Sequence, residues 1–351
     1  MKKTFFIFLC SLIGITEARS QSLAERSPVV ALRLTTNARA AGIGNATLAT
    51  EYDGTDISNT AKLPWAMDNI QGLEIARNTY SVSGKQFNTA LLYSFTYAHA
   101  DEAGHDFSFG VKYFDGGDIL NALSHGNDYR DLIIEAGYAK KITPRMALAL
   151  ISKVLNSRID LNGSTDALAF DLVWYYRATN QWGKGYSAGA ALSNIGTTID
   201  YGVGAGKFLP ATVAIAGAYT WVNDRTDNKC MVTMEINKSL APAFPDSLAD
   251  QKRYESQNTL EALFINTTKG FTASVGIEYT FKLSPYPYST DAISIRTGGV
   301  LDNFAEEFSG VTTGIGIVFK KVHIDVAYFI TPKVPTSPVG NKVTASLSFG
   351  F

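Results

Sequence analysis

The sequence contains few of the residues that build disulfide frameworks or metal centres. Two cysteines and four histidines occur among its 351 residues. Cys10 lies in an amino-terminal apolar stretch that we expect to be removed, which leaves Cys230 alone. A single cysteine cannot form an intramolecular disulfide or a thiolate cluster, and the scattered histidines do not specify a zinc site. We therefore expect no metal and no cofactor.

Two further absences exclude other classes of protein. The 31 basic and 32 acidic residues nearly cancel, so the chain lacks the concentrated basic surface that nucleic-acid binding requires. None of the Gly-x-Ser-x-Gly, His-Glu-x-x-His and P-loop motifs occurs. A catalytic pair inside a barrel would leave no such motif, but the sequence specifies no serine partner for His323. We expect a protein that is not an enzyme and that binds no nucleic acid.

The amino terminus has the form of a secretory signal peptide. Lys2 and Lys3 precede an apolar stretch at 4–15 that is too short to span a bilayer, and small and polar residues follow at 18–22. No later uncharged apolar run is long enough for a membrane helix. We expect cleavage near Gln21, so that residues 1–21 are a signal peptide and the rest of the chain is exported.

The carboxyl-terminal residues alternate between apolar and small polar side chains. Successive side chains of a strand point to opposite faces, and in a transmembrane barrel one face meets lipid while the other meets a polar lumen. A soluble β-sandwich would rarely end on such a strand with a terminal aromatic residue. The apolar set is Val343, Ala345, Leu347, Phe349 and Phe351, and the other set is Lys342, Thr344, Ser346, Ser348 and Gly350.

The same alternation recurs along the chain and predicts an all-β fold, a transmembrane antiparallel β-barrel of about 14 strands over residues 71–351. If the carboxyl terminus is periplasmic, short and long connections alternate as outer-membrane barrels require. The connection at 282–291 is long for a periplasmic turn, which leaves a miscount open. The expected strands lie near 71–80, 91–98, 106–114, 132–140, 146–156, 167–177, 186–195, 211–222, 230–237, 271–281, 292–301, 312–319, 322–329 and 343–351.

Charged residues fall on the faces that we expect to line the lumen. Acidic and basic side chains on an enclosed wall pair as a structural network more often than they catalyse. The residues concerned are Lys112, Glu135, Asp171, Glu278, Arg296, His323 and Asp325.

The segment before the first strand resembles the amino-terminal signature of FadL-type barrels. Residues 34–46 read Leu-Thr-Thr-Asn-Ala-Arg-Ala-Ala-Gly-Ile-Gly-Asn-Ala, and an Asn-Thr-Ala-Lys-Leu stretch follows at 59–63. In that group the segment lies in the lumen of a 14-stranded barrel. The resemblance implies that residues 22–70 form a lumen plug, in which glycines allow close backbone approach and a buried arginine needs a carboxylate or carbonyl partner. The plug residues are Asn37, Arg39, Gly42, Gly44 and Asn59.

An ordered series of short motifs resembles the PorV family of the type IX secretion system. The motifs lie at 113–119, 192–199, 208–212 and 235–238, in the order and rough spacing of that family. The chain departs from the family pattern at 241–245, which reads Ala-Pro-Ala-Phe-Pro, and at 56–59. These departures are compatible with a divergent paralogue that has a different client.

This resemblance implies a non-enzymatic role in the outer membrane. PorV-like barrels bind the C-terminal signal domains of secreted proteins at the type IX translocon and deliver them to a surface complex that contains a peptidase-transferase. Exposed apolar residues of the extracellular loops would form the binding rim; the alternative is that they anchor the barrel in the lipid interface. The candidate cargo-binding residues are Phe208, Leu209, Phe244, Phe304 and Phe308.

Two other functions remain open. A FadL-like channel would take up hydrophobic small molecules, and a PorQ-like subunit would be a structural partner in the surface complex. A channel for apolar ligands should have an apolar interior face. The expected lumen faces carry small and polar residues such as Ser108, Thr272, Ser274, Ser346 and Ser348, which favours the secretion role.

Overall fold

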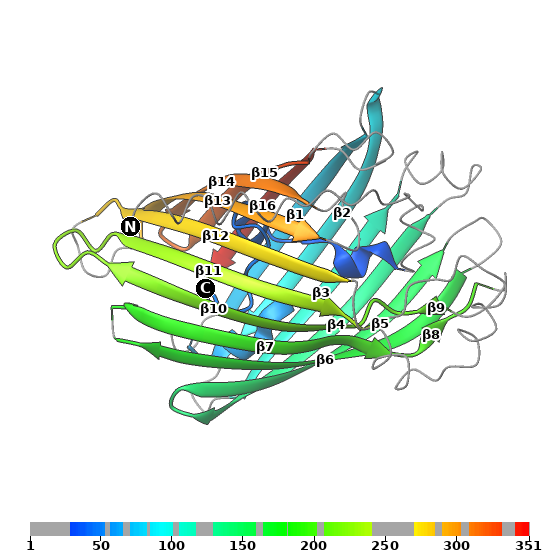
Figure 1. The fold of residues 1–351 in the computed structure, drawn as a ribbon, viewed down its shortest axis with the longest axis horizontal. Helices are drawn as coiled ribbons and strands as arrows, with labels where there is room; N and C mark the ends of the chain where they lie inside the picture. Colours follow the sequence, from blue (N-terminus) through cyan, green and yellow to red (C-terminus); the bar gives the residue numbers. More distant parts are fainter. Residues whose placement is uncertain are drawn as a thin grey trace.

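The protein forms one closed antiparallel β-barrel of fourteen strands (Figure 1). The order around the barrel is β1-β16-β15-β14-β13-β12-β11-β10-β7-β6-β5-β4-β3-β2, and β1 closes the barrel on β16 with Gly72 opposite Gly350. A separate two-stranded sheet joins β8 to β9. This computed structural model describes residues 29–52, 57–65, 71–82, 85–100, 105–116, 129–158, 164–180, 182–201, 207–240, 270–284, 290–302, 309–331 and 341–350.

The elements have the following bounds. Three short helices precede the barrel: η1 (Val30–Arg33), α3 (Ala38–Gly42) and η2 (Ile57–Trp65). The strands are β1 (Gln71–Val82), β2 (Lys85–His99), β3 (His105–Asp115), β4 (Arg130–Thr143), β5 (Met146–Arg158), β6 (Ser164–Thr179), β7 (Gly185–Gly196), β8 (Thr198–Ile199), β9 (Lys207–Phe208), β10 (Thr212–Val222), β11 (Lys229–Ser239), β12 (Phe271–Lys282), β13 (Ala292–Asp302), β14 (Gly310–Phe319), β15 (Val322–Ile330) and β16 (Lys342–Gly350).

The predicted barrel and its strands are confirmed. Each of the fourteen expected segments coincides with one barrel strand. The 283–291 connection joins β12 to its direct neighbour β13, so its length does not reflect a missed strand. The largest difference is at β2, which begins at Lys85 rather than near 91. Residues 85–90 are mostly polar and carry little apolar alternation, so the pattern could not identify them.

The two faces of the wall differ as the alternation predicts. On β16, Val343 is 44% exposed, whereas Thr344, Ser346 and Ser348 are buried. Large apolar side chains cover the outer face of the other strands in the same way, as in β12, where Val275 and Ile277 are exposed while Ser274 and Glu278 are buried. An apolar outer surface around a polar interior is the arrangement of a transmembrane barrel.

The two ends of the barrel have connections of different length. The turns at 144–145 and 320–321 lie at the end where β16 finishes, on the left in Figure 1, which we call the short-turn end. The connections at 116–129, 197–211 and 240–270 lie at the other end, the long-loop end. Two connections depart from the alternation expected from the sequence: only two residues separate β1 from β2 at the long-loop end, and the nine residues at 283–291 lie at the short-turn end. No helix in the described ranges has the length and apolar character needed to cross a membrane.

The helices of the amino-terminal segment pack against the buried side of the wall. α3 contacts β13 to β16, η2 contacts β2 to β6, and η1 contacts β3 and β4. In Figure 1 the blue segment is seen behind the front strands of the barrel. The three helices therefore pack against two arcs of the wall, one from β13 to β16 and one from β2 to β6.

Candidate functional site: the charged interior of the barrel

Opposite charges alternate in a chain that crosses the interior from β6 to β15. On the β6 side, Arg177 Nη2 lies 3.4 Å from Glu51 Oε1. The backbone carbonyl of Glu51 accepts a hydrogen bond from Arg39 Nη1 at 3.2 Å. β6 and β15 lie seven strands apart in either direction around the fourteen, so the chain of charges joins opposite walls.

Arg39 connects this chain to the far wall. Its guanidinium donates to Glu278 of β12 twice, from Nε at 2.8 Å and from Nη2 at 2.9 Å. Arg296 Nε on β13 lies 2.5 Å from Glu278 Oε2, and Arg296 also pairs with Asp325 on β15. Arg39 thus has both partners that a buried guanidinium needs, a carboxylate and a carbonyl.

These charges form a balanced network. Three cationic and three anionic side chains alternate, and Arg296, Glu278 and Asp325 are each less than 10% exposed. Because an isolated buried charge is costly, groups of this kind persist only when they are paired. The predicted pairing of the lumen charges extends to two other places: Lys112 pairs with Glu135 at 2.9 Å, and Lys153 pairs with Asp171 at 2.6 Å.

The residues after Arg39 lie directly against the backbone of the wall. Gly44 has φ +67°, and a Cβ atom there would lie 2.9 Å from the Gly299 backbone and from the Val275 carbonyl oxygen. A Cβ on Gly42 would lie 3.3 Å from Cδ of Arg296. Glycine adopts a positive φ without strain, and its lack of a side chain leaves room for this close approach.

Asn37 ties α3 to the seam where the barrel closes. Its side-chain oxygen accepts a hydrogen bond from the Ala40 amide at 2.9 Å, which caps the helix. Its Nδ2 donates to Glu74 of β1 at 2.7 Å, and Ser348 of β16 donates to the same carboxylate at 3.2 Å. One glutamate therefore joins the first strand, the last strand and the amino-terminal segment.

η2 is held on the other side of the lumen. Lys62, which is 1% exposed, donates to the Thr47 carbonyl at 2.6 Å and lies 3.0 Å from the Thr50 hydroxyl. The Thr60 and Ser108 hydroxyls are 2.9 Å apart. Asn59 lies in η2, but its side chain is outside the described part of the structure.

At the long-loop end, η1 is fixed to a buried carboxylate. Asp131 accepts hydrogen bonds from the Ala31 amide at 3.1 Å, from the Tyr129 hydroxyl at 3.1 Å and from the Ser157 hydroxyl at 2.5 Å. Burial, and then the adjacent Asp131 carboxylate, raise the pKa of Tyr129 well above its usual value, so its phenol remains a donor. Apolar residues around η1, among them Leu92 and Ile133, complete this contact.

A cavity of about 240 Å³ remains beside η1. Its lining includes Asn45, Glu235 and Lys342, together with Arg33 and Asp302, which pair at 3.1 Å. Apolar side chains, among them Leu32, Leu34 and Phe329, line the rest of it, so the cavity offers both polar and apolar surface.

Of the five candidate cargo-binding residues, the structure describes Phe208 and Leu209, and neither is exposed. Phe208 and Leu209 are 6% and 3% exposed, so the expectation that they lie on the surface is wrong. β9, which contains Phe208, pairs with β8. Asn194 Nδ2 donates a hydrogen bond to the Pro210 carbonyl at 3.2 Å, and Leu209 packs in the apolar cluster around η1. Phe244, Phe304 and Phe308 lie outside the described residues.

The interior residues missed at the level of sequence include Glu51, Lys62 and Lys153. Glu51 lies in a stretch with no periodicity, and no feature of the sequence marks it. Lys62 stands within the Asn-Thr-Ala-Lys-Leu motif, which could have indicated its place inside the barrel. Lys153 lies on a wall face that is otherwise largely apolar, with Ile151 and Leu155 as neighbours, and only the charge itself is a clue. The described residues contain no group of His, Cys, Asp or Glu side chains placed to bind a metal ion.

Comparison with solved structures places the barrel among outer-membrane transporters in fold. The Pseudomonas putida toluene transporter TodX has a TM-score of 0.51 and 15% identity, over 89% of this chain and 96% of that chain. The CymD monoaromatic hydrocarbon channel has a TM-score of 0.54 and 12% identity, over 94% of this chain and 98% of that chain. At these identities the likeness concerns the fold alone. No curated protein matches this chain.

A family model identifies the chain more closely. The model, described as Type IX secretion system protein PorV, matches residues 17–246, which is well over half of the chain. The match includes the amino-terminal segment and the wall as far as β11. This chain belongs to the PorV family of the type IX secretion system.

Proposed function

We propose that this protein is an outer-membrane component of the type IX secretion system that binds the C-terminal signal domains of secreted proteins. It carries them from the translocon to the cell-surface complex that contains the peptidase-transferase. The observation that carries this proposal is the PorV family match over residues 17–246. The apolar outer surface of the barrel supports a place in the outer membrane, with the short-turn end in the periplasm and residues 1–21 removed as a signal peptide.

In this proposal, residues 22–70 act as a plug. The chain of charges through Arg39 and Glu51 joins opposite walls, which supports a lumen that stays closed while clients bind outside it. Removing one member would leave the remaining charges unpaired in the interior, so the segment is costly to displace.

Clients would bind at the long-loop end. Phe304 and Phe308 precede β14, and Phe244 lies in the long connection between β11 and β12, so all three belong to loops of this end. Aromatic side chains commonly supply a large share of the binding energy at protein interfaces. Since Phe208 and Leu209 are buried, their role would be to support the 197–211 connection rather than to touch a client.

A second candidate function is uptake of small molecules. It is favoured by the fold likeness to TodX and CymD, which are described as a toluene transporter and a monoaromatic hydrocarbon channel. The charged residues in the lining of the interior cavity weigh against a purely apolar ligand, because Glu235, Asp302 and Lys342 would lose hydration beside it.

The deciding experiment is a pull-down of the tagged protein from its native outer membrane in a gentle detergent, followed by mass spectrometry of proteins and small molecules. Secreted proteins that share a C-terminal domain, or the surface transferase, would support the secretion role. The matched control is an unrelated outer-membrane barrel with the same tag, from the same cells. A barrel that arrives alone with bound fatty or aromatic molecules would instead support transport.

A further inference from the structure

The outer face of β3 to β7 carries a cluster of basic side chains at the short-turn end. Lys140, Arg145 and Lys184 are exposed there, whereas Lys141 lies on the other face of β4, with its Nζ 5.2 Å from the centroid of the Trp65 ring of η2. Within 105–116, 129–158, 164–180 and 182–201, no exposed acidic side chain lies at this end of these strands. Over these ranges the basic cluster therefore has an excess of positive charge, although the sequence also places Asp101 and Glu102 in the connection that precedes β3.

Strand register places the basic residues beside apolar ones on the same face. His105 lies directly opposite Lys140, and Lys140 lies opposite Leu148 on the next strand. Leu148 lies opposite Trp174 in turn. These four residues form one row across neighbouring strands. Leu148 is 40% exposed, so an apolar side chain lies on the outer surface directly beside the cationic Lys140.

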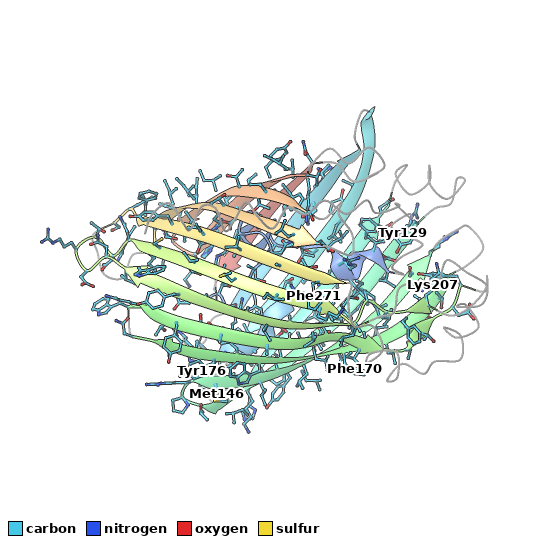
Figure 2. The ribbon with its side chains drawn as sticks, viewed as in Figure 1. Tyr129, Met146, Phe170, Tyr176, Lys207 and Phe271 are labelled. Carbon is cyan, nitrogen blue, oxygen red and sulfur yellow. The ribbon has the colours of Figure 1, made fainter. Side chains whose placement is uncertain are left out.

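A stack of aromatic rings positions the arginine of the cluster. Trp174 and Tyr176 stack with ring centroids 6.2 Å apart, and Tyr176 and Tyr186 stack at 6.0 Å. The Tyr176 side chain hydrogen-bonds with those of Tyr186 and Arg145. Tyr176 lies opposite Met146 in the strand register, and Figure 2 shows both on the outside of the barrel at this end. The Arg145 guanidinium therefore lies next to Tyr and Trp rings, which are enriched at the membrane–water interface.

We infer that this basic cluster binds the headgroup of an anionic phospholipid in the periplasmic leaflet of the outer membrane. Arg145 and Lys140 contact the phosphate, which a guanidinium can bind through two parallel hydrogen bonds. Trp174, Tyr176 and Leu148 pack against the glycerol and the upper acyl chains. The inference rests on the proposed orientation of the barrel, but not on client binding, so either can fail without the other.

The other basic turn of the short-turn end provides a matched comparison. Lys320 and Lys321 join β14 to β15, and Lys320 Nζ lies 5.3 Å from the centroid of the Phe319 ring. Here an acidic residue is present, since the Lys320 amide donates to Asp291 Oδ1 at 2.8 Å. This turn combines two lysines with an aromatic ring, and it contains no arginine.

The test is native mass spectrometry of the purified full-length barrel titrated with phosphatidylglycerol or phosphatidylethanolamine. The Lys140→Gln/Arg145→Gln variant should lose phosphatidylglycerol affinity by about 30-fold, the effect of two basic side chains near an anionic lipid surface. Tyr176→Phe, which keeps the ring but removes the hydroxyl contact with Arg145, should give a smaller loss in the same direction. Lys320→Gln/Lys321→Gln should bind as the unchanged protein does.

Three results would overturn the inference. The first is unchanged phosphatidylglycerol binding in Lys140→Gln/Arg145→Gln. The second is an equal loss of phosphatidylglycerol affinity in Lys140→Gln/Arg145→Gln and in Lys320→Gln/Lys321→Gln, because an equal loss would reflect general charge attraction. The third is equal binding of both lipids by the unchanged protein. Heat-modifiable migration on gels shows whether each variant has formed its barrel, and Tyr176→Phe keeps the test decisive if the double variant does not fold.

Discussion

Arg39 and Glu278 are separated by 239 positions in the sequence, yet two hydrogen bonds of 2.8 and 2.9 Å join their side chains inside the barrel. The arginine comes from the amino-terminal segment and the glutamate from the middle of β12. The pair therefore fixes the segment to the wall at a defined position, and it is the link through which Glu51 and Arg177 connect to Arg296 and Asp325.

Replacing Arg39 with methionine should destabilise the barrel by roughly 3–5 kcal/mol, because Glu278 then lacks one of its two buried cations. The measurement is urea unfolding of the protein in lipid vesicles, followed by tryptophan fluorescence. Arg77→Met is the control, since Arg77 is exposed on β1. Similar midpoints for the two variants would show that the interior pair contributes no more than a surface arginine does.

Gly44→Ala should loosen the amino-terminal segment. A non-glycine residue at φ +67° carries roughly 1–3 kcal/mol of strain, and the added Cβ would press on the Gly299 backbone. Limited proteolysis should cut the segment faster in this variant. Gly217→Ala is the matched control, because a Cβ there meets no atom within 4 Å. Equal cleavage rates in both variants would contradict the close packing of the segment.

Removing residues 22–66 should convert a closed barrel into a conducting one. The segment spans the lumen between β6 and β12, so its loss leaves a polar channel inside the wall. Single-channel recording in planar bilayers would compare the deletion variant with the full-length protein, with barrel formation checked by heat-modifiable migration. Equal conductance in both would refute the plug.

Phe304→Ser/Phe308→Ser should weaken client binding by about tenfold or more, the effect of losing interface aromatic residues. Retention of a purified client C-terminal domain on the immobilised barrel gives the measurement. The control is Phe271→Ser, because Phe271 is an exposed aromatic at the long-loop end of β12, labelled in Figure 2. Unchanged retention in the loop variant would remove Phe304 and Phe308 from the site and favour their role as lipid anchors.

Deleting Phe351 should reduce insertion into the outer membrane. The strand at 343–351 resembles the closing strand of outer-membrane barrels, whose terminal aromatic residue is read as a sorting signal during assembly. The fraction of heat-modifiable protein in outer-membrane preparations measures the effect, and Phe351→Trp should retain insertion. Normal insertion of the shortened chain would count against this reading of the closing strand.

The strands could be predicted because a wall between lipid and a polar interior imposes a two-residue period on every strand. The charged lumen faces followed from the same period, but their partners did not. Nothing local relates Arg39 to Glu278, or Arg177 to Glu51, since each contact depends on how the whole sheet closes. Phe208 and Leu209 show the same limit: their apolar character indicated a contact, and only the folded 197–211 connection shows that the contact is internal.

The seam between β1 and β16 determines the order of events in assembly. Until Val343 and its neighbours pair with Thr79 and the rest of β1, both edges of the sheet carry unpaired amide and carbonyl groups. Such groups cannot enter hydrocarbon without a large cost, so closure and membrane insertion must proceed together. Asn78 of β1 donates to the Thr36 carbonyl of the amino-terminal segment and accepts from Thr344 of β16. The closing strand therefore pairs with a residue that the amino-terminal segment already holds. The amino-terminal segment can therefore act as an internal template on which the final strand docks, and a chain without it would have to find its closing register unaided.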